Sequence, residues 1–168
     1  YRTNLTGANL SGARLSNADL SQSELTGADL SNAELYNTQL MGANLSEANL
    51  AGADLQKAQL TNTNLYRANL TSAWLASAQL QDANLSQANL FKSTLNSANL
   101  QDADLSQANL MEASLIKANL QDVDLQDADL NKAILFKASV SKAALIEAQL
   151  CLTSLPDYTT HSRDCDRT

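Results

Sequence analysis

The chain has 168 residues and a formal net charge of −7, from 11 basic and 18 acidic side chains. No apolar run approaches the roughly 18 residues that a membrane-spanning helix needs, and the acidic balance disfavours nucleic acid as a ligand, because binding phosphates requires clustered Lys and Arg. Hydrophobic residues make up 44% of the chain but aromatic residues only 4%, so the interior must be built mainly from Ala and Leu.

A period of five residues runs through the sequence. From Leu5 to Leu155 every fifth residue is apolar, and of these 31 positions only Val140 is not Leu. A small residue lies two positions before each of them, and it is Ala in 24 of the 31 units. On an α-helix this period would spread the Leu residues around the axis, and on a straight strand it would send them to alternate faces. We therefore expect one turn in every unit, so that each Ala-x-Leu pair points into a common interior.

A second period of twenty residues indicates how the units are arranged. Residues 81–90 read QDANLSQANL, residues 101–110 read QDADLSQANL, and residues 121–130 read QDVDLQDADL. A fixed period of this length is typical of a solenoid, here with four units in each coil.

The repeat unit also carries a family resemblance. Ala83-Asn84-Leu85 and Ala103-Asp104-Leu105 show the pattern Ala-(Asn/Asp)-Leu-x-x, which resembles the pentapeptide-repeat family, and above all its near-perfect cyanobacterial and thylakoid-lumen members. The resemblance covers residues 1–155. It implies an all-β, right-handed, four-sided parallel β-helix of about eight coils, each about 4.8 Å thick, with the Leu and the preceding small residue inside.

Residues twenty apart are predicted to stack in columns on the outside of such a rod. An asparagine column (Asn49, Asn69, Asn89, Asn109) and a glutamine column (Gln39, Gln59, Gln79) are expected to be structural. A third column, Asp82, Asp102 and Asp122, lies in a segment, residues 81–130, with a net charge of −6. These carboxylates could bind a cation or a basic partner, although a solvated edge is the simpler interpretation.

Outward apolar residues gather late in the chain and, together with the neighbouring edge of Asp82, Asp102 and Asp122, form a candidate interaction surface. Phe91 is predicted to stack over Met111 on one face, and Ile116 over Phe136 on the next. Ile134 and Ile146 are expected close by. Because contiguous exposed apolar surface usually marks an interface, either the C-terminal tail or a second protein should cover this cluster.

The repeat is predicted to end at residue 155. Pro156 cannot donate the next backbone hydrogen bond, so residues 156–168 are expected to form a capping tail. A disulfide between Cys151 and Cys165 would hold this tail over the open end, although free thiols remain the alternative. The disulfide would imply an oxidising compartment, such as the thylakoid lumen, periplasm or extracellular space, whereas free thiols would allow a cytoplasmic location.

The sequence offers no catalytic, cofactor-binding or metal-binding residues that we can assign. The single histidine, His161, lies in the tail, and a filled rod has no cleft of the usual active-site kind. We therefore expect a non-catalytic structural or protein-interaction solenoid, with a protein partner or a homodimer contact through a rod end or the late apolar cluster, and without membrane insertion. The family resemblance supplies an alternative, a DNA-mimicking regulator of DNA gyrase or another topoisomerase of the quinolone-resistance type. A passive spacer within a longer polypeptide is a third interpretation.

Overall fold

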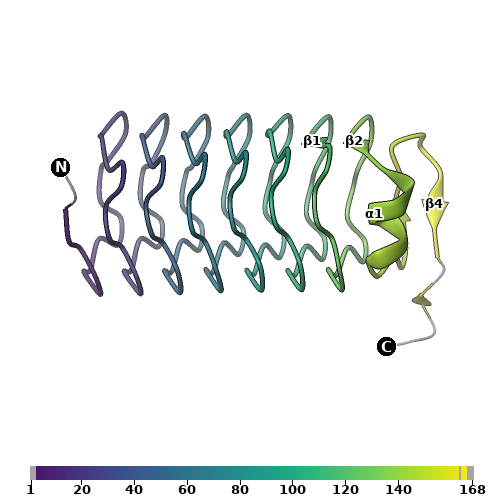
Figure 1. Ribbon diagram of the computed structural model, residues 1–168, viewed down its shortest axis with the longest axis horizontal. Coiled ribbons are helices and arrows are strands. Elements are labelled where there is room, and N and C mark those ends of the chain that lie inside the picture. The colour runs from purple at the N-terminus through teal and green to yellow at the C-terminus, as the bar shows by residue number, and fades with distance from the viewer. Residues whose placement is uncertain (1–2, 163, 166–168) are drawn as a thin grey trace.

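The computed structural model, which describes residues 3–162, 164 and 165, is a rod of stacked coils (Figure 1). Parallel β-bridges join residues that are twenty apart, from Asn4 and Glu24 at one end to Ile134 and Ser154 at the other. The predicted all-β solenoid with twenty residues in each coil is therefore confirmed. The described part of the chain begins at one end of the rod and ends at the other.

Four columns of bridges define four sides, which we number in the order in which the chain visits them. They run through Asn64 and Asn84 (first side), Asn69 and Asn89 (second side), Trp74 and Thr94 (third side), and Gln79 and Asn99 (fourth side). The first and third sides are therefore opposite each other, and a two-residue turn forms each corner between neighbouring sides.

The interior is a column of leucine side chains. Every fifth residue from Leu25 to Leu135 is at most 2% exposed. The flanking backbone is satisfied by the neighbouring coils, because Leu65 donates to the carbonyl of Asn84 at 2.7 Å and Asn84 donates to the carbonyl of Thr63 at 3.0 Å. The turn after Leu65 is closed by a bond from the amide of Ala68 to the Leu65 carbonyl at 2.9 Å. Burial of Leu and complete backbone pairing together hold the coils in register.

Asparagine and aspartate precede Leu so often because they build the corners. The Oδ1 atom of Asn64 accepts a hydrogen bond from the backbone amide of Tyr66 at 3.1 Å, an arrangement for which Asn and Asp are suited. The Asn column also bonds between coils, since Asn69 Nδ2 donates to Asn49 Oδ1 at 3.0 Å. The Gln column does not do this at Gln59, whose side chain donates to the carbonyl of Lys57 at 3.1 Å.

These corner contacts predict how the fold responds to acid. Hydrogen bonds from the amide and hydroxyl of Ser31 hold the pKa of Asp29 below its usual value, and those of Ser21 do the same for Asp19. A carboxyl with a lower pKa in the folded state stabilises the fold at neutral pH, and this contribution disappears as the pH falls below about 4. Asn keeps an Oδ1 acceptor for the serine amide but does not titrate, so D19N/D29N should lose less of its melting temperature on acidification than the parent protein. Equal losses in thermal melts between pH 7 and pH 3 would contradict this.

A buried hydroxyl gives a second prediction about the fold. Within the described residues, the Oγ atom of Ser93 is buried without a hydrogen-bond partner, whereas the equivalent hydroxyl of Thr63 donates to the carbonyl of Leu40 at 2.8 Å. An unpaired buried hydroxyl costs about 1 kcal/mol or more. S93A should therefore raise the free energy of unfolding by about 1 kcal/mol, and T63V should lower it by about the same amount. Urea unfolding followed by circular dichroism measures both, and a loss of stability in S93A would refute the assignment.

A short helix interrupts the regular coils near the C-terminal end of the rod. Strands β1 (Asn119–Leu120) and β2 (Ser139–Val140) still pair in parallel. The chain then forms the six-residue helix α1 (Lys142–Glu147), where the repeat pattern predicts another coil unit. Ser141 caps this helix, accepting a bond from the amide of Ala144 at 3.1 Å, and the run Lys-Ala-Ala-Leu consists of strong helix formers. The coil register returns where Asp129 bridges to Gln149.

The tail folds back on the last coil. Strand β3 (Thr153–Ser154) pairs antiparallel with β4 (Thr160–His161), which lies beyond the last coil in Figure 1. The buried carboxylate of Asp164 accepts a bond from the amide of Leu150 at 3.0 Å. Cys151 and Cys165 form a disulfide with their Cα atoms 4.7 Å apart. Because an antiparallel strand reverses the chain direction, the parallel stack stops here.

Candidate functional site

The apolar residues singled out in the sequence gather on the third side of the rod. Phe91 and Met111 occupy successive levels of one corner, since the amide of Lys92 donates to the carbonyl of Met111 at 3.1 Å. Ile116 and Phe136 are stacked in the same way at the other corner, where the amide of Lys117 donates to the carbonyl of Phe136 at 2.9 Å. The sequence predicts these two columns on successive faces, but they are the two edges of one side.

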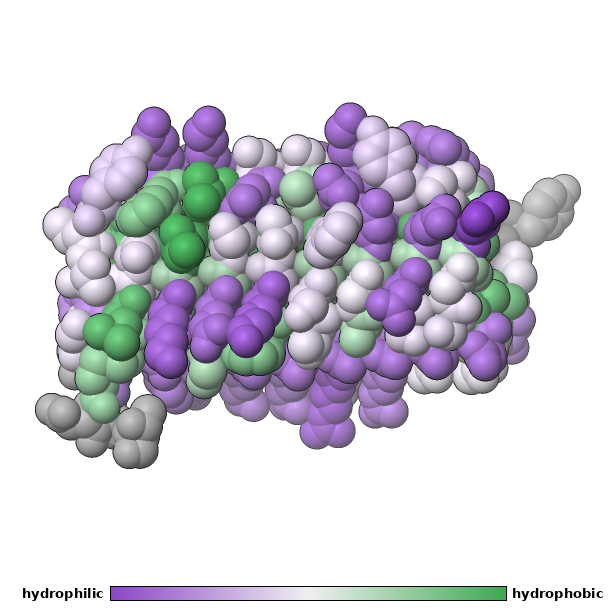
Figure 2. Space-filling view, turned by 180° about the vertical axis from the view of Figure 1, so that it is seen from behind, coloured by the Kyte–Doolittle hydropathy of each residue, from purple (hydrophilic) through white to green (hydrophobic). Residues whose placement is uncertain are grey.

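The residues between these edges complete the surface. Trp74, Thr94, Ser114 and Ile134 form the bridge column of the third side, and Trp74 is 55% exposed. We call this surface the apolar side and define it as Trp74, Phe91, Met111, Ile116, Ile134 and Phe136. Figure 2 shows it from the front, with hydrophobic colour gathered toward the C-terminal end and hydrophilic residues above and below.

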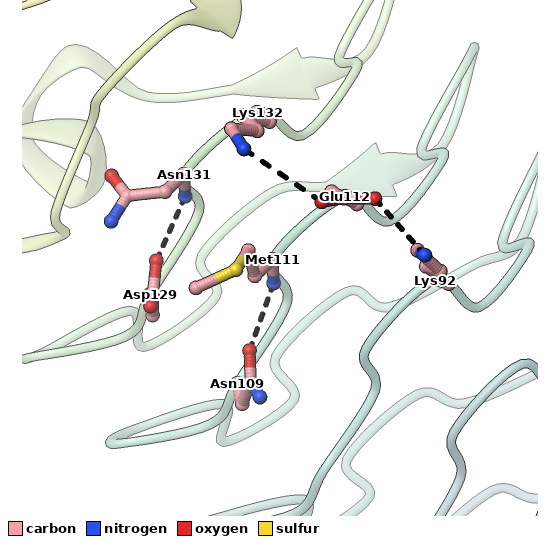
Figure 3. Close-up of polar contacts among 7 residues, drawn as sticks. All are labelled: Lys92, Asn109, Met111, Glu112, Asp129, Asn131 and Lys132. Carbon is pink, nitrogen blue, oxygen red and sulfur yellow. Dashed lines mark hydrogen bonds and ion pairs between the residues drawn. The ribbon is translucent and has the colours of Figure 1, made fainter.

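Lysine residues follow the apolar residues at both corners. Lys92 and Lys132 flank Glu112, with Nζ–carboxylate distances of 3.5 and 3.9 Å (Figure 3). The opposite corner carries Lys117 and Lys137, which occupy equivalent positions one coil apart. Both edges of the apolar side are therefore positively charged overall. We call the lysines at positions 92, 117, 132 and 137 the lysine rims.

The acidic residues are segregated from this surface. Between residues 81 and 140, all four lysines belong to the lysine rims, and of the eight acidic residues only Glu112 lies beside them. The others lie on or beside the first and second sides, at positions 82, 102, 104, 122, 124, 127 and 129. Between residues 81 and 140 the third side is therefore apolar with positively charged edges, and the first and second sides are acidic. Toward the N-terminus the bridge column of the third side continues with the acidic residues Asp54 and Glu34.

The predicted aspartate column is one part of the acidic surface. Asp82, Asp102 and Asp122 are exposed at the corner between the fourth and first sides. Successive coils are joined there by bonds such as that from the amide of Asp82 to the carbonyl of Gln101 at 3.1 Å. The whole fourth side separates this column from the apolar side, so the two do not form one site. Among the described residues, no group of His, Cys, Asp and Glu side chains is arranged to hold a metal ion.

Ile146 does not join the apolar side. It lies on α1, is 68% exposed, and lines a separate hollow with Lys142, Leu145, Leu150, Leu155 and His161. Among the described residues of the tail, Tyr158 reaches the C-terminal end of the apolar side, where its ring lies 4.9 Å from that of Phe136. Phe91, Met111 and Ile116 remain part of the partly exposed surface.

The sequence analysis gave no role to two aromatic residues of this region. Trp74 lies on the apolar side, and Tyr36 lies on the corner that also carries Ile116 and Phe136. The Nζ atom of Lys57 lies 5.2 Å from the centre of the Tyr36 ring and donates to its hydroxyl at 2.7 Å. Both residues could have been found by extending the columns of period twenty toward the N-terminus.

Comparisons with known proteins agree with this geometry. The family model "Pentapeptide repeats" matches residues 3–42, 43–78, 73–110, 93–131 and 113–150. HetL of the cyanobacterium Nostoc sp. strain PCC 7120, a pentapeptide repeat protein involved in heterocyst differentiation regulation, is 35% identical over 95% of this chain and 87% of its own, with a TM-score of 0.46. A variant of QnrB1, a plasmid-mediated fluoroquinolone resistance protein, is 16% identical over 94% of this chain and 91% of its own, with a TM-score of 0.67.

A pentapeptide repeat protein from the Arabidopsis thaliana thylakoid lumen is 22% identical over 86% of this chain and 72% of its own, with a TM-score of 0.26. No curated protein matches the chain. Within the part of the chain that the structure describes, no helix combines the length and hydrophobicity needed to cross a membrane. The family match spans the coils and their repeat units, and the fold is its right-handed four-sided β-helix: the chain belongs to the pentapeptide-repeat family.

Proposed function

We propose that this protein is a non-catalytic, protein-binding solenoid and that the apolar side is its binding surface. The observation that carries the proposal is the segregation of side chains between residues 81 and 140: apolar residues and lysines share the third side, and every acidic residue except Glu112 lies on or beside the other sides. An apolar centre with a charged rim is the usual anatomy of a protein interface.

Two polar groups of this surface, the hydroxyl of Ser114 and the amide of Ile116, are already paired. Ser114 Oγ donates to Asn96 Oδ1 at 2.7 Å, and the same oxygen accepts a bond from the amide of Ile116 at 3.0 Å. Covering these atoms with a partner therefore leaves no donor of Ser114 or Ile116 unsatisfied. The stacked coils also hold the surface rigid, so that little conformational entropy is lost on binding.

The disulfide supports an oxidising compartment as the site of this function. The bond between Cys151 and Cys165 joins the tail to the last coil, and such bonds persist where the surroundings are oxidising. We therefore place the protein in the thylakoid lumen, periplasm or extracellular space. Alkylation of the protein isolated under acid quench, with and without reduction, tests this placement, since free thiols in the native material would favour the cytoplasm.

Affinity capture with paired variants tests the binding surface. F91S/I116S removes two apolar residues from the apolar side and leaves the contact between Phe136 and Tyr158 intact. M41S/Y66S, the control, removes apolar side chains from other parts of the rod, including Met41, which is 46% exposed. Proteins captured from an extract of the source organism by the parent and by M41S/Y66S, but not by F91S/I116S, would support the proposal. The same captured set with all three proteins would refute it.

A regulator of DNA gyrase is the second candidate. The net charge of −6 between residues 81 and 130 favours it, because duplex DNA is also a negatively charged rod. Against it, the lysine rims interrupt the negative surface on one side, whereas DNA carries phosphates all around. A supercoiling assay with excess protein distinguishes the two candidates: inhibition or protection of gyrase supports the DNA mimic, and an unchanged rate excludes it.

A further inference from the structure

We propose that the apolar side binds one amphipathic α-helix of a partner protein, laid along the rod, whose apolar stripe is flanked by acidic residues. This inference rests on the proposed function and specifies the chemistry of the partner. It follows from four properties of the surface: its backbone pairing, its width, its length and its charge.

The backbone of the third side cannot form hydrogen bonds with a β-strand of a partner. Trp74, for example, donates to the carbonyl of Ala53 at 2.9 Å, and its own carbonyl accepts from Leu55 at 2.7 Å. The same pairing repeats at Thr94, which donates to Ala73 at 3.0 Å and accepts from Leu75 at 2.7 Å. A partner cannot add a strand to a side whose amides and carbonyls are already paired. It must bind through side chains, as a helix does when it lies on an apolar surface.

The width of the apolar side suits one helix. Three to four extended residues separate the corner of Phe91 from the corner of Asn96, which corresponds to roughly 10 Å. An α-helix with its side chains is about 10–12 Å across. Small residues, Thr94 and Ser114, lie at the two middle levels between the larger corner side chains, and Trp74 and Ile134 occupy the same column one coil beyond them at either end. The centre of the side is therefore lower at these two levels and can receive apolar side chains of the helix between Trp74 and Ile134.

The length of the surface sets the length of the helix. The apolar side runs from Trp74 to Ile134, three coils later, which is about 14 Å at 4.8 Å for each coil. A helix of about 10 residues spans this distance at 1.5 Å for each residue. A helical peptide of about 16 residues therefore covers the whole surface with roughly one further turn at each end.

The charge of the rims selects the flanks of that helix. Lys92 and Lys132 border one edge, with Glu112 between them, and Lys117 and Lys137 border the other. Acidic residues on both flanks of the apolar stripe would meet a lysine rim on each side. An anionic membrane would meet the same lysines, but the net charge of −7 opposes its approach. The net charge therefore favours a protein partner that contacts only the lysine rims over an extended negative surface such as a membrane.

Stapled helical peptides of about 16 residues test the inference. Three peptides share one leucine stripe, at positions i, i+3, i+4 and i+7, and carry Glu, Gln or Lys on both flanks. Fluorescence polarisation should show that the Glu-flanked peptide binds at least about tenfold more tightly than the Lys-flanked peptide, which corresponds to about 1.4 kcal/mol. Its binding should weaken as NaCl rises from about 50 to about 500 mM.

Variants of the protein separate local from overall charge. K117Q/K137Q removes two positive charges from one rim, and Q87E/Q107E adds two negative charges at a corner between the first and second sides, so both variants have the same net charge. All four positions are left-handed corner residues, with φ between 57° and 60°. K117Q/K137Q should weaken binding of the Glu-flanked peptide about fivefold, Q87E/Q107E should change it less than about twofold, and F91S/I116S should abolish it.

The outcomes of these experiments distinguish the helix proposal from the more general proposal of a protein-binding function. Equal binding of the three peptides, or equal weakening by the two charge variants, would overturn the helix proposal. Binding to vesicles that contain about one-quarter phosphatidylglycerol, without binding to the Glu-flanked peptide, would also overturn it and identify a lipid surface instead. If affinity capture still depends on Phe91 and Ile116 while the peptides fail, the protein-binding function stands and the helix as partner is wrong.

Discussion

L65A is expected to lower the free energy of unfolding by about 3 kcal/mol, within the range of 2–5 kcal/mol that large-to-small substitutions cost in a closed core. Leu65 is fully buried and lies one coil away from Leu45 on one side and Leu85 on the other. The coils on both sides are joined to it by backbone hydrogen bonds, so they cannot move inward to fill the space left by the lost side chain. Urea unfolding of the parent and the variant, followed by circular dichroism, measures the loss.

The equivalent substitution at the end of the rod provides the control for this prediction. Leu5 is in the first coil and is only partly buried, so L5A removes less buried surface and leaves a space open to solvent. It should cost about 1 kcal/mol. If L5A and L65A cost the same, the interior is not a continuous, closely packed column of leucines.

Removing the disulfide should cost about 3 kcal/mol, the value expected for a closed loop of roughly 15 residues. The sequence separation of Cys151 and Cys165 is 14 residues. Without the bond, only non-covalent contacts connect the described tail residues to the last coils, among them the hydrogen bond of Asp164 with the amide of Leu150, the two-residue pairing of β3 with β4 and the ring contact of Tyr158 with Phe136. C151S/C165S should therefore expose the last coil, and its tail should be cleaved first in limited proteolysis.

Reduction of the parent protein serves as the control for the double variant. Dithiothreitol should lower the stability of the parent to that of C151S/C165S and leave the double variant unchanged. If reduction and the double substitution have no effect on unfolding or on proteolysis of the tail, the disulfide does not hold the cap.

Much of the fold could be predicted from the sequence because one physical pattern repeats throughout it. A Leu every fifth residue, a small residue two positions before it, and Asn or Asp between them define the core and the corners of every coil. Helix α1 could not be read from this pattern, because Ala143 and Leu145 keep the period of five while the local sequence favours a helix. Local helix propensity and the Ser141 cap prevail there over the register of the repeat.

The candidate site was predictable only in part, because a column shows which residues stack but not which columns share a side. Phe91 and Ile116 were recognised as outward apolar residues, but their position at opposite edges of one side depends on the turn geometry of each corner. For the same reason, the aspartate column and the apolar cluster were predicted to form one surface, although the fourth side separates them. Once the corners are known, the segregation of lysines and acidic residues can be read directly from the sequence.

Site-specific photo-cross-linking tests most directly the claim that the apolar side is the binding surface. Benzoylphenylalanine is placed either at Ser97, beside the apolar side, or at Gln107, at the corner between the first and second sides. Both residues are exposed corner positions with nearly equal φ, 58° and 57°. In cells of the source organism, the probe at position 97 should form one discrete cross-linked protein species that F91S/I116S removes, and the probe at position 107 should not. Cross-links of equal yield from both positions, or from position 107 alone, would contradict the claim.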